Sequence, residues 1–251
     1  GTCNSLSVPH CYELTDVGLG EHIITLCVDN RIGEIQPGVD AHSVSDNTQS
    51  NWNGIIGEIE LYARPKANVV DVRIEPLIAK RSIKTEVCLN VKGGANVNGV
   101  LKLRVKSLFG DEKTLKTVEK DVRLNKGANQ LDIEYDMDES FELWDEFNPF
   151  LYELSVILDT KYGKDELKET FGLRELGTEG TQITVNGRPV FFRGTLECCI
   201  FPKTGFPPTE EVEWSRIMKI CKSYGLNHIR FHSWCPPEAA FNAADKLGMY
   251  L

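Results

Sequence analysis

The C-terminal part of the sequence alternates between short apolar strands and amphipathic helices, and this pattern restricts the fold more than any other feature. Residues 190–194 (VFFRG) and 228–233 (HIRFHS) are the expected strands. Residues 209–224 and 237–247 are the helices that follow them, and residues 249–251 begin a third strand. Strands that alternate with helices pair in parallel, and the chemistry of such sheets lies where strands end. Because the pattern is still running at the last residue, we expect the chain to be part of a larger protein.

The boundaries of these elements can also be predicted from local signals. In the first helix the apolar residues repeat at helical spacing, at Trp214, Ile217, Met218 and Cys221. Thr209 is the expected N-cap, and Gly225 and Gly248 follow the two helices, as expected for C-terminal stops. Pro237 suits the first position of the second helix. Ahead of the first strand, Asn186–Gly187 stands between two β-like runs and predicts a hairpin.

The middle of the sequence has a different period. Between residues 68 and 171, about seven short runs alternate apolar and polar residues, with Gly-rich turns between them. The runs are residues 70–74, 85–91, 101–105, 118–124, 131–135, 151–158 and 166–170. This spacing predicts an antiparallel β-sandwich. Charged residues fill its outward positions, so the simplest interpretation is a spacer domain without chemistry.

The first 66 residues contain too few strands for a domain of their own. Residues 23–28 and 57–61 are expected strands, and a polar stretch, residues 29–53, separates them. Two or three strands leave edges and one face open, so we expect the end of a larger β domain. A metal site made of Asp40, His42 and Asp46 is an alternative interpretation of the polar stretch. Because Asp and His in loops usually face water or form turns, we expect no metal.

Charge and cysteine content restrict the class of protein. A formal net charge of −9 argues against nucleic acid and anionic membranes as partners, and no apolar run approaches the ~20 residues of a membrane span. The eight cysteines form no C-x-x-C pair and no zinc-type spacing. Cys27 and Cys221 lie within apolar patterns, so we expect buried free thiols.

Three segments resemble glycoside hydrolase family 2. Residues 51–61 (NWNGIIGEIEL) resemble the closing strand of its N-terminal jelly-roll domain. Residues 171–174 (FGLR) and 183–194 (ITVNGRPVFFRG) resemble the beginning of its barrel. Residues 227–230 (NHIR) and 244–251 (ADKLGMYL) are similar to its second β/α unit. The resemblance covers nearly the whole chain, in the family's order.

The resemblance implies a multi-domain, mainly β fold. Residues 1–66 would be the C-terminal part of a jelly-roll sugar-binding domain, residues 67–172 an immunoglobulin-like β-sandwich, and residues 173–251 the first βα units of a TIM (β/α)₈ barrel. It implies a retaining β-glycosidase that hydrolyses O-glycosidic bonds, takes a carbohydrate as its partner and needs no organic cofactor. The sequence leaves the oligomeric state open, and a homo-oligomer is one of the states it allows. The alternative is a non-catalytic carbohydrate-binding or spacer module.

The resemblance also implies where catalysis takes place. Retaining hydrolysis needs two carboxyl groups about 5–5.5 Å apart. In the family, the acid/base Glu follows an Asn at the end of the fourth barrel strand, and the nucleophile Glu ends the seventh. This sequence reaches only the third strand, so we expect no catalytic residue in it and no hydrolysis by this polypeptide alone.

Substrate-binding residues are expected at the C-terminal ends of the first two barrel strands. Glu197 follows the first strand, while Arg230, His232 and Trp234 lie at the end of the second. Arg230 matches the family's Arg on that strand and would orient a carboxylate or donate to sugar hydroxyls, or else pair with a structural acid. Trp234 would stack on a sugar or cap the barrel core. Asn51 would reach the pocket from the jelly-roll loop, or simply form a turn.

Two departures from the family pattern affect specificity. Many members read Arg-x-Ser-His-Tyr-Pro on the second strand, whereas residues 230–236 read RFHSWCP. Whether His232 or Ser233 faces the pocket therefore stays open, because alternate side chains point to opposite faces. The β-galactosidases of the family read Arg-Gly-x-Asn-x-His after the first strand, whereas residues 193–199 read RGTLECC. This difference argues against an ordinary galactoside as the substrate.

Overall fold

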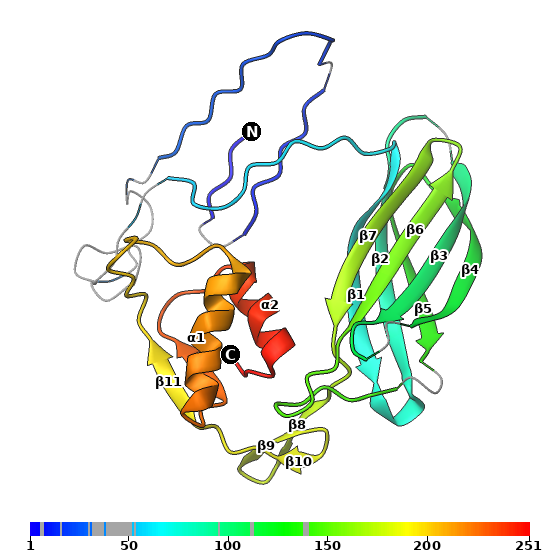
Figure 1. Ribbon diagram of the computed structural model, residues 1–251. Coiled ribbons are helices and arrows are strands. Elements are labelled where there is room, and N and C mark those ends of the chain that lie inside the picture. The colour runs from blue at the N-terminus through cyan, green and yellow to red at the C-terminus, as the bar shows by residue number, and fades with distance from the viewer. Residues whose placement is uncertain are drawn as a thin grey trace. The chain divides into compact units, whose positions relative to one another are not determined.

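The structure of the protein is a computed structural model, and its strands far outnumber its helices (Figure 1). It describes residues 1–5, 8–15, 17–29, 31, 38, 52, 54–94, 96–110, 113–137 and 141–251. The chain divides into two compact units. The first contains Gly1–Ile59, Arg193–Ala244 and Met249–Leu251, and the second contains Glu60–Phe192 and Asp245–Gly248. In the part of the chain described, no helix is long and apolar enough to cross a membrane.

The second unit is built on an antiparallel β-sandwich, as the alternating runs predict (Figure 1). One sheet has the order β1-β2-β5, with β1 at Ala67–Leu77, β2 at Ser82–Val91 and β5 at Gly127–Asp136. The other has the order β4-β3-β6-β7, with β3 at Val97–Ser107, β4 at Thr114–Leu124, β6 at Tyr152–Thr160 and β7 at Gly163–Phe171. A short 3₁₀ helix, Ile78–Lys80, connects β1 to β2.

Strand alternation builds the core of this sandwich. On the neighbouring strands β3 and β6, Leu101, Leu103, Leu154, Val156 and Leu158 are fully buried, whereas Lys102 and Ile157 between them are only half-buried. Burial of a Leu side chain stabilises a fold by roughly 1.5–3 kcal/mol. The buried cluster lies entirely between Ala67 and Leu173, so the sandwich has a core of its own.

A small hairpin follows the sandwich in the same unit. It contains β8 at Leu176–Glu179, β9 at Gln182–Val185 and β10 at Arg188–Pro189, paired in the order β10-β9-β8. Asn186 and Gly187 have φ angles of 52° and 73°. Two successive left-handed residues are typical of a tight I′ turn, so the hairpin predicted from Asn-Gly is confirmed.

The first unit contains the strand–helix repeat. Its elements are β11 at Gly194–Glu197, α1 at Glu211–Ser223, β12 at His228–Phe231 and α2 at Glu238–Leu247, whose last residues belong to the second unit. β11 and β12 pair in parallel, from Gly194 opposite His228 to Glu197 opposite Phe231. A parallel bridge from His228 to Tyr250 adds the beginning of a third strand. The parallel pairing predicted from the repeat is therefore present.

The first strand of the repeat is displaced from its predicted position. The strand expected at residues 190–194 begins only at Gly194. The apolar run is divided because Val190 N–H donates to the Ile183 carbonyl and so extends the hairpin. Arg193 N–H donates to the Asn227 side chain at 2.8 Å instead of entering a strand ladder.

The helix ends agree only in part with their prediction. The predicted N-cap, Thr209, is wrong, because Glu210 occupies that position and its side chain makes no capping bond. Both C-terminal glycines are confirmed, with φ angles of 78° at Gly225 and 65° at Gly248. On α1, Trp214 and Met218 are buried, as the apolar stripe predicts.

The predicted N-terminal strands are absent. Residues 23–28 and 57–61 are all described, and neither segment forms a strand. Their apolar side chains are exposed, at 92% for Ile23 and 78% for Leu61. The physical reason is that a strand needs a partner, and neither segment pairs with a described residue in a sheet.

The expected burial of the cysteines is also wrong for most of them. All eight are described and free, but only Cys199 is buried. Cys3, Cys11, Cys27 and Cys235 are exposed. Cys27 lies in one of the segments that form no strand, so its apolar neighbours provide no core around it.

Candidate functional site

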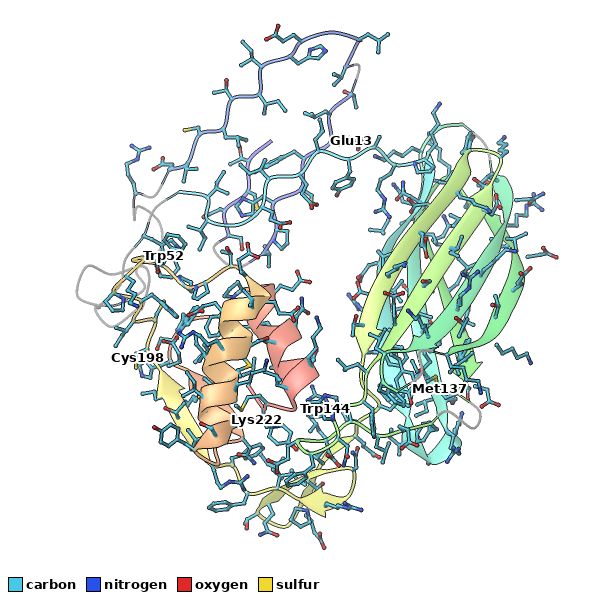
Figure 2. All side chains as sticks on the ribbon, in the orientation of Figure 1. Glu13, Trp52, Met137, Trp144, Cys198 and Lys222 are labelled. Carbon is cyan, nitrogen blue, oxygen red and sulfur yellow. The ribbon has the colours of Figure 1, made fainter. Side chains whose placement is uncertain are left out.

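The ends of β11 and β12 bring most of the candidate residues to one edge. The two strands are parallel and in register, so Glu197 and Phe231 end them at the same level. Arg230 precedes Phe231, and His232 and Trp234 follow it. Cys198, labelled in Figure 2, marks the point at which the chain leaves β11.

The Glu197 carbonyl joins the two strand ends. It accepts a hydrogen bond from His232 N–H at 2.9 Å and one from Trp234 Nε1 at 3.4 Å. The first continues the strand ladder by one step beyond β12. The second fixes the indole of Trp234 to the end of β11, so the loop after β12 is held to its neighbour.

The Glu197 carboxylate organises the loop after β11. Both of its oxygens lie 3.0 Å from the Cys199 nitrogen, and Oε1 also accepts from Ile200 N–H at 3.4 Å. Cys199 has a left-handed φ of 61°, which is uncommon for a residue with a side chain. Hydrogen bonds from backbone amides to a carboxylate offset part of that conformational cost. The sequence-based interpretation overlooked this role, because nothing in the sequence marks Cys199 as a left-handed residue.

Cys199 itself is not a candidate nucleophile. Its side chain is fully buried. Burial, and secondarily the charge of Glu197, raises the pKa of the Cys199 thiol to about 12. The reactive form of cysteine is the thiolate, so this thiol is inert near neutral pH.

Trp234 belongs to a cluster of four aromatic rings. Its ring centroid lies 5.2 Å from that of Phe231, 6.2 Å from Phe201 and 6.4 Å from Trp214. Trp214 Nε1 donates to the Pro208 carbonyl at 2.8 Å. The contacts of Trp234 with Phe231 and Phe201 are edge-to-face, an arrangement that stabilises aromatic packing. They are the contacts expected of the core-capping alternative for Trp234.

Arg230 points away from this cluster. Phe231 packs against Trp214 of α1, with ring centroids 5.7 Å apart, and Ile229 is buried. Because strand residues alternate, Arg230 lies on the opposite face of the strands from α1. It is exposed, and its guanidinium makes no hydrogen bond or ion pair with any residue that the structure describes. Its five donors are thus available to a ligand.

His232 lies on the same side of the strand end as Arg230. Its Nδ1 is 3.3 Å from the Ser233 hydroxyl oxygen, and the ring is half-buried. Ser233 is exposed and has a left-handed φ of 60°. Each of the two strands is therefore followed, two residues after its end, by a strained non-glycine residue, a feature that often accompanies binding loops.

The remaining candidates are not brought to this edge. Asn51 lies outside the described residues, and so do Asp40, His42 and Asp46 of the alternative metal site. Among the residues that are described, no group of three or more His, Cys, Asp or Glu could hold a metal ion. Chemically, the strand-end edge offers cationic and neutral hydrogen-bond donors on an apolar support.

Comparison with known proteins adds a family. Residues 67–174 match the family model for glycosyl hydrolases family 2. The chain is 21% identical over 212 residues to a β-galactosidase of Staphylococcus xylosus, covering 84% of this chain and 20% of that protein. It is 24% identical over 203 residues to a β-glucuronidase of Streptococcus agalactiae, covering 79% of this chain and 31% of that protein. The chain thus spans between a fifth and a third of the length of these two relatives.

The fold is similar to that of solved members. A family 2 β-galacturonidase from Eisenbergiella tayi, solved with bound galacturonate, matches with a TM-score of 0.65 and 20% identity. The match covers 88% of this chain and 38% of that protein. The mainly β structure agrees with the sandwich domains of the family. The sandwich therefore matches the model of glycoside hydrolase family 2, and the longer sequence is similar to glycosidases of known sequence.

Proposed function

We propose that this chain is part of a retaining β-glycosidase that hydrolyses O-glycosidic bonds in carbohydrates. The observation that supports this most directly is the parallel register of β11 and β12, which places Arg230 and His232 at one strand-end edge. Parallel strands separated by a helix are the unit of a (β/α)₈ barrel, and active sites of such barrels form at this edge. Curated relatives are β-galactosidases and a β-glucuronidase, which supports a glycosidase as the kind of enzyme.

The proposal divides the chain into three parts. Residues 1–66 would belong to a jelly-roll domain, residues 67–172 to the sandwich, and residues 173–251 to the beginning of a TIM barrel. The family model, which matches residues 67–174, supports the second of these three parts. The sandwich would then serve as a support for the barrel and take no part in the chemistry.

The proposed sugar-binding residues have different tasks. Arg230 and His232 would donate to hydroxyl or carboxylate oxygens of the substrate, since Arg230 is exposed and has no bound acceptor among the described residues. Glu197 and Trp234 would border the site and hold its loops through the contacts of the Glu197 carbonyl and carboxylate. Asn51, from the jelly-roll part, would complete the set.

The catalytic carboxylic acids of the family follow the fourth and seventh barrel strands, and residues 173–251 would contain only the first three. We therefore propose that this polypeptide alone hydrolyses no glycoside and that it requires no organic cofactor or metal. Retaining hydrolysis needs only two carboxyl groups and water.

The test compares this chain with a longer protein encoded by the same reading frame. Both are assayed on a panel of nitrophenyl β-glycosides, including galactosides, glucuronides and galacturonides. We expect turnover by the longer protein and none by this chain. Turnover by this chain that survives repurification would contradict the placement of the catalytic pair, and binding without turnover by the longer protein would favour the non-catalytic module.

A matched pair of variants tests Arg230 in the longer protein. Arg230→Ala removes the exposed guanidinium at the strand edge, and we expect it to lower kcat/KM about a hundredfold. Arg216→Ala removes an exposed guanidinium of α1 that pairs with Glu213 at the surface, and we expect no change. Equal effects of the two substitutions would contradict a substrate-binding role for Arg230.

A further inference from the structure

The second unit contains a pocket of about 260 Å³ that the proposed function does not use. Ile74 and Pro76 of β1 and Phe171 at the end of β7 form its apolar side. Trp144, Gly172, Arg174 and Asp245 complete its lining. Ligand pockets of drug-sized molecules usually exceed ~300 Å³, so this pocket suits a smaller ligand.

Trp144, labelled in Figure 2, fixes the groups around the pocket. Its indole is buried, and Nε1 donates to the Asp245 carbonyl at 2.7 Å. Its backbone N–H donates to the Leu173 carbonyl at 2.9 Å, and its carbonyl accepts from Asn186 Nδ2 at 3.1 Å. Arg174 follows the anchored Leu173, and the backbone of Asp245 is itself anchored, so both residues are held at fixed backbone positions.

Arg174 and Asp245 are the two charged residues that line the pocket. The Arg174 Cζ atom lies 5.1 Å from the centre of the Trp144 ring. Neither the Arg174 guanidinium nor the Asp245 carboxylate makes a hydrogen bond or ion pair with any described residue. Asp245 is half-buried, and burial raises the pKa of its carboxyl, while the charge of Arg174 opposes that shift. Asp245 has thus lost part of its water without gaining a hydrogen-bond partner among the described residues, which is uncommon for a carboxylate. Arg174 is exposed, so its donors are available to a ligand that enters the pocket.

We propose that this pocket binds one neutral, hydroxyl-rich ring, such as a single sugar unit. A hydroxyl both donates and accepts hydrogen bonds, so neighbouring hydroxyls can donate to Asp245 and accept from Arg174. The opposite charges of the two groups disfavour a ligand with a net charge of either sign. Ile74, Pro76 and Phe171 offer an apolar surface for the C–H face of the ring. The site is independent of the β11–β12 edge and of the glycosidase proposal.

The test uses the Trp144 indole N–H as a reporter, because it lies at the pocket lining. The ¹⁵N-labelled chain is titrated with methyl β-D-glucopyranoside, and the Trp144 indole resonance is identified with a Trp144→Phe variant. We expect a saturable shift of that resonance, with a dissociation constant in the millimolar range. Arg174→Gln and Asp245→Asn should each weaken binding about tenfold, the effect of losing one hydrogen bond to a charged group.

The controls make the same charge changes elsewhere. Lys84 and Asp132 form an exposed ion pair at 3.2 Å on the sheet formed by β1, β2 and β5. Lys84→Gln and Asp132→Asn should leave the titration unchanged. Arg174→Lys, which keeps the charge but loses the planar fork, should still weaken binding and provides a conservative variant if Arg174→Gln fails to fold.

Three results would overturn the proposal. The first is the absence of a saturable shift of the Trp144 resonance in the unmodified chain. The second is a shift that persists unchanged in folded Arg174 and Asp245 variants. The third is a response to sodium acetate without a response to the glycoside, because it would identify an anion site. None of these results depends on whether the longer protein hydrolyses glycosides, so the two proposals fail separately.

Discussion

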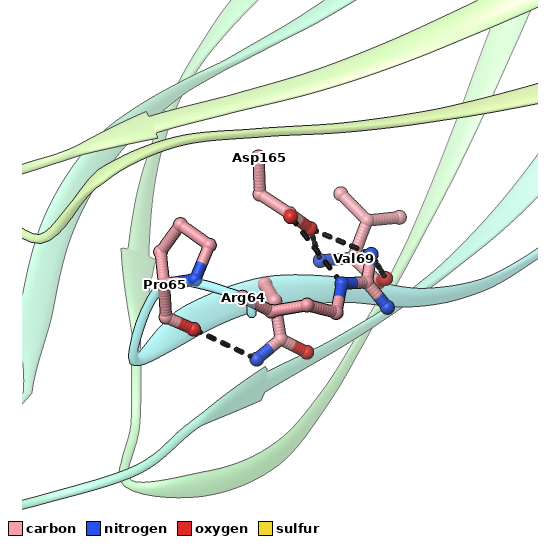
Figure 3. A network of polar contacts seen from close by, with 5 residues as sticks. Arg64, Pro65, Val69 and Asp165 are labelled. Carbon is pink, nitrogen blue, oxygen red and sulfur yellow. Dashed lines mark hydrogen bonds and ion pairs between the residues drawn. The ribbon is translucent and has the colours of Figure 1, made fainter. Parts of the chain in front are cut away.

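Asp165 on β7 binds the chain at the beginning of the sandwich (Figure 3). Its carboxylate is buried, and Oδ2 accepts from Val69 N–H at 2.7 Å and from Arg64 Nη2 at 2.8 Å. Arg64 Nη2 also donates to the Val69 carbonyl at 2.6 Å. Arg64 and Asp165 together therefore bind both the N–H and the carbonyl of Val69. A buried carboxylate with these partners is screened little by solvent.

We predict that Asp165→Ala lowers the free energy of unfolding by about 3 kcal/mol, because it leaves a partly buried guanidinium and a backbone amide without their acceptor. Asp159→Ala is the control, since Asp159 of β6 pairs with Lys164 of β7 at 3.7 Å on the exposed surface. It should cost less than about 1 kcal/mol. Urea unfolding measures both free energies of unfolding. Similar losses for the two variants would contradict the claim that burial makes the Asp165 contacts stronger.

Cys199 allows a prediction about pH at the same scale. Burial raises the pKa of its thiol from 9.0 to about 12, so about one thiol in a thousand is ionised at pH 9 in the folded chain. Iodoacetamide should therefore label the exposed Cys3, Cys11 and Cys235 near pH 9 and leave Cys199 intact, as read by peptide mass spectrometry. Labelling of Cys199 at the rate of Cys235 in the folded chain would contradict this.

The sign of the linked stability follows from the same shift. The unfolded thiol loses its proton first as the pH rises above 9, so the unfolded state gains stability relative to the folded one. The contribution of Cys199 is therefore complete below pH 9 and is lost as the pH approaches 12. In Cys199→Ala, the fall of stability over this range should be less steep.

At the scale of elements, the sequence predicted the strands and helices that follow from a local residue pattern. It missed the strand boundaries that depend on which segments pair with each other. The sandwich strands and α1 follow from alternation and helical spacing. The strand at residues 190–194 was placed too early, because Val190 instead pairs with Ile183 of the hairpin. An apolar run also predicted a strand at residues 23–28, where no described partner exists. The pattern of apolar residues shows that a segment can form a strand, but the strand forms only where a neighbouring strand pairs with it.

The glycines that end α1 and α2 give a matched prediction. Both are left-handed, but a Cβ at Gly248 would lie 2.7 Å from the Glu146 carbonyl oxygen, whereas one at Gly225 would meet open space. Gly225→Ala should cost about 1–2 kcal/mol, the usual price of a left-handed residue with a side chain. Gly248→Ala should cost clearly more, because backbone must move as well. Thermal unfolding measures both losses of stability. Equal losses would show that the Glu146 backbone moves away from a Cβ at residue 248 without cost.

At the scale of the whole molecule, the sequence predicted the strand-end edge at which the candidate residues lie, but not the contacts that these residues make. The parallel repeat placed Glu197, Arg230, His232 and Trp234 near one edge. The sequence could not show that the Glu197 carboxylate binds the Cys199 amide or that Trp234 packs within four aromatic rings. These contacts depend on loop backbone angles, such as the left-handed φ of Cys199, for which a non-glycine residue gives no signal.

The distribution of the core leads to a prediction for the whole chain. The main buried cluster lies between Ala67 and Leu173, whereas Ile23 and Leu61 are largely exposed and residues 17–29 and 54–66 contain no helix or strand. Protection from proteolysis requires buried side chains and backbone hydrogen bonds within regular structure. Brief treatment with a protease of broad specificity should therefore cut within residues 17–29 or 54–66 well before it cuts β1–β7. Mass spectrometry should find a resistant product that contains Ala67–Phe171.

The Asp165→Ala variant should shorten the lifetime of that product, because it weakens the sandwich, whereas Asp159→Ala should not. Equal cleavage rates on both sides of Ala67 would contradict the assignment of the stable core to the sandwich.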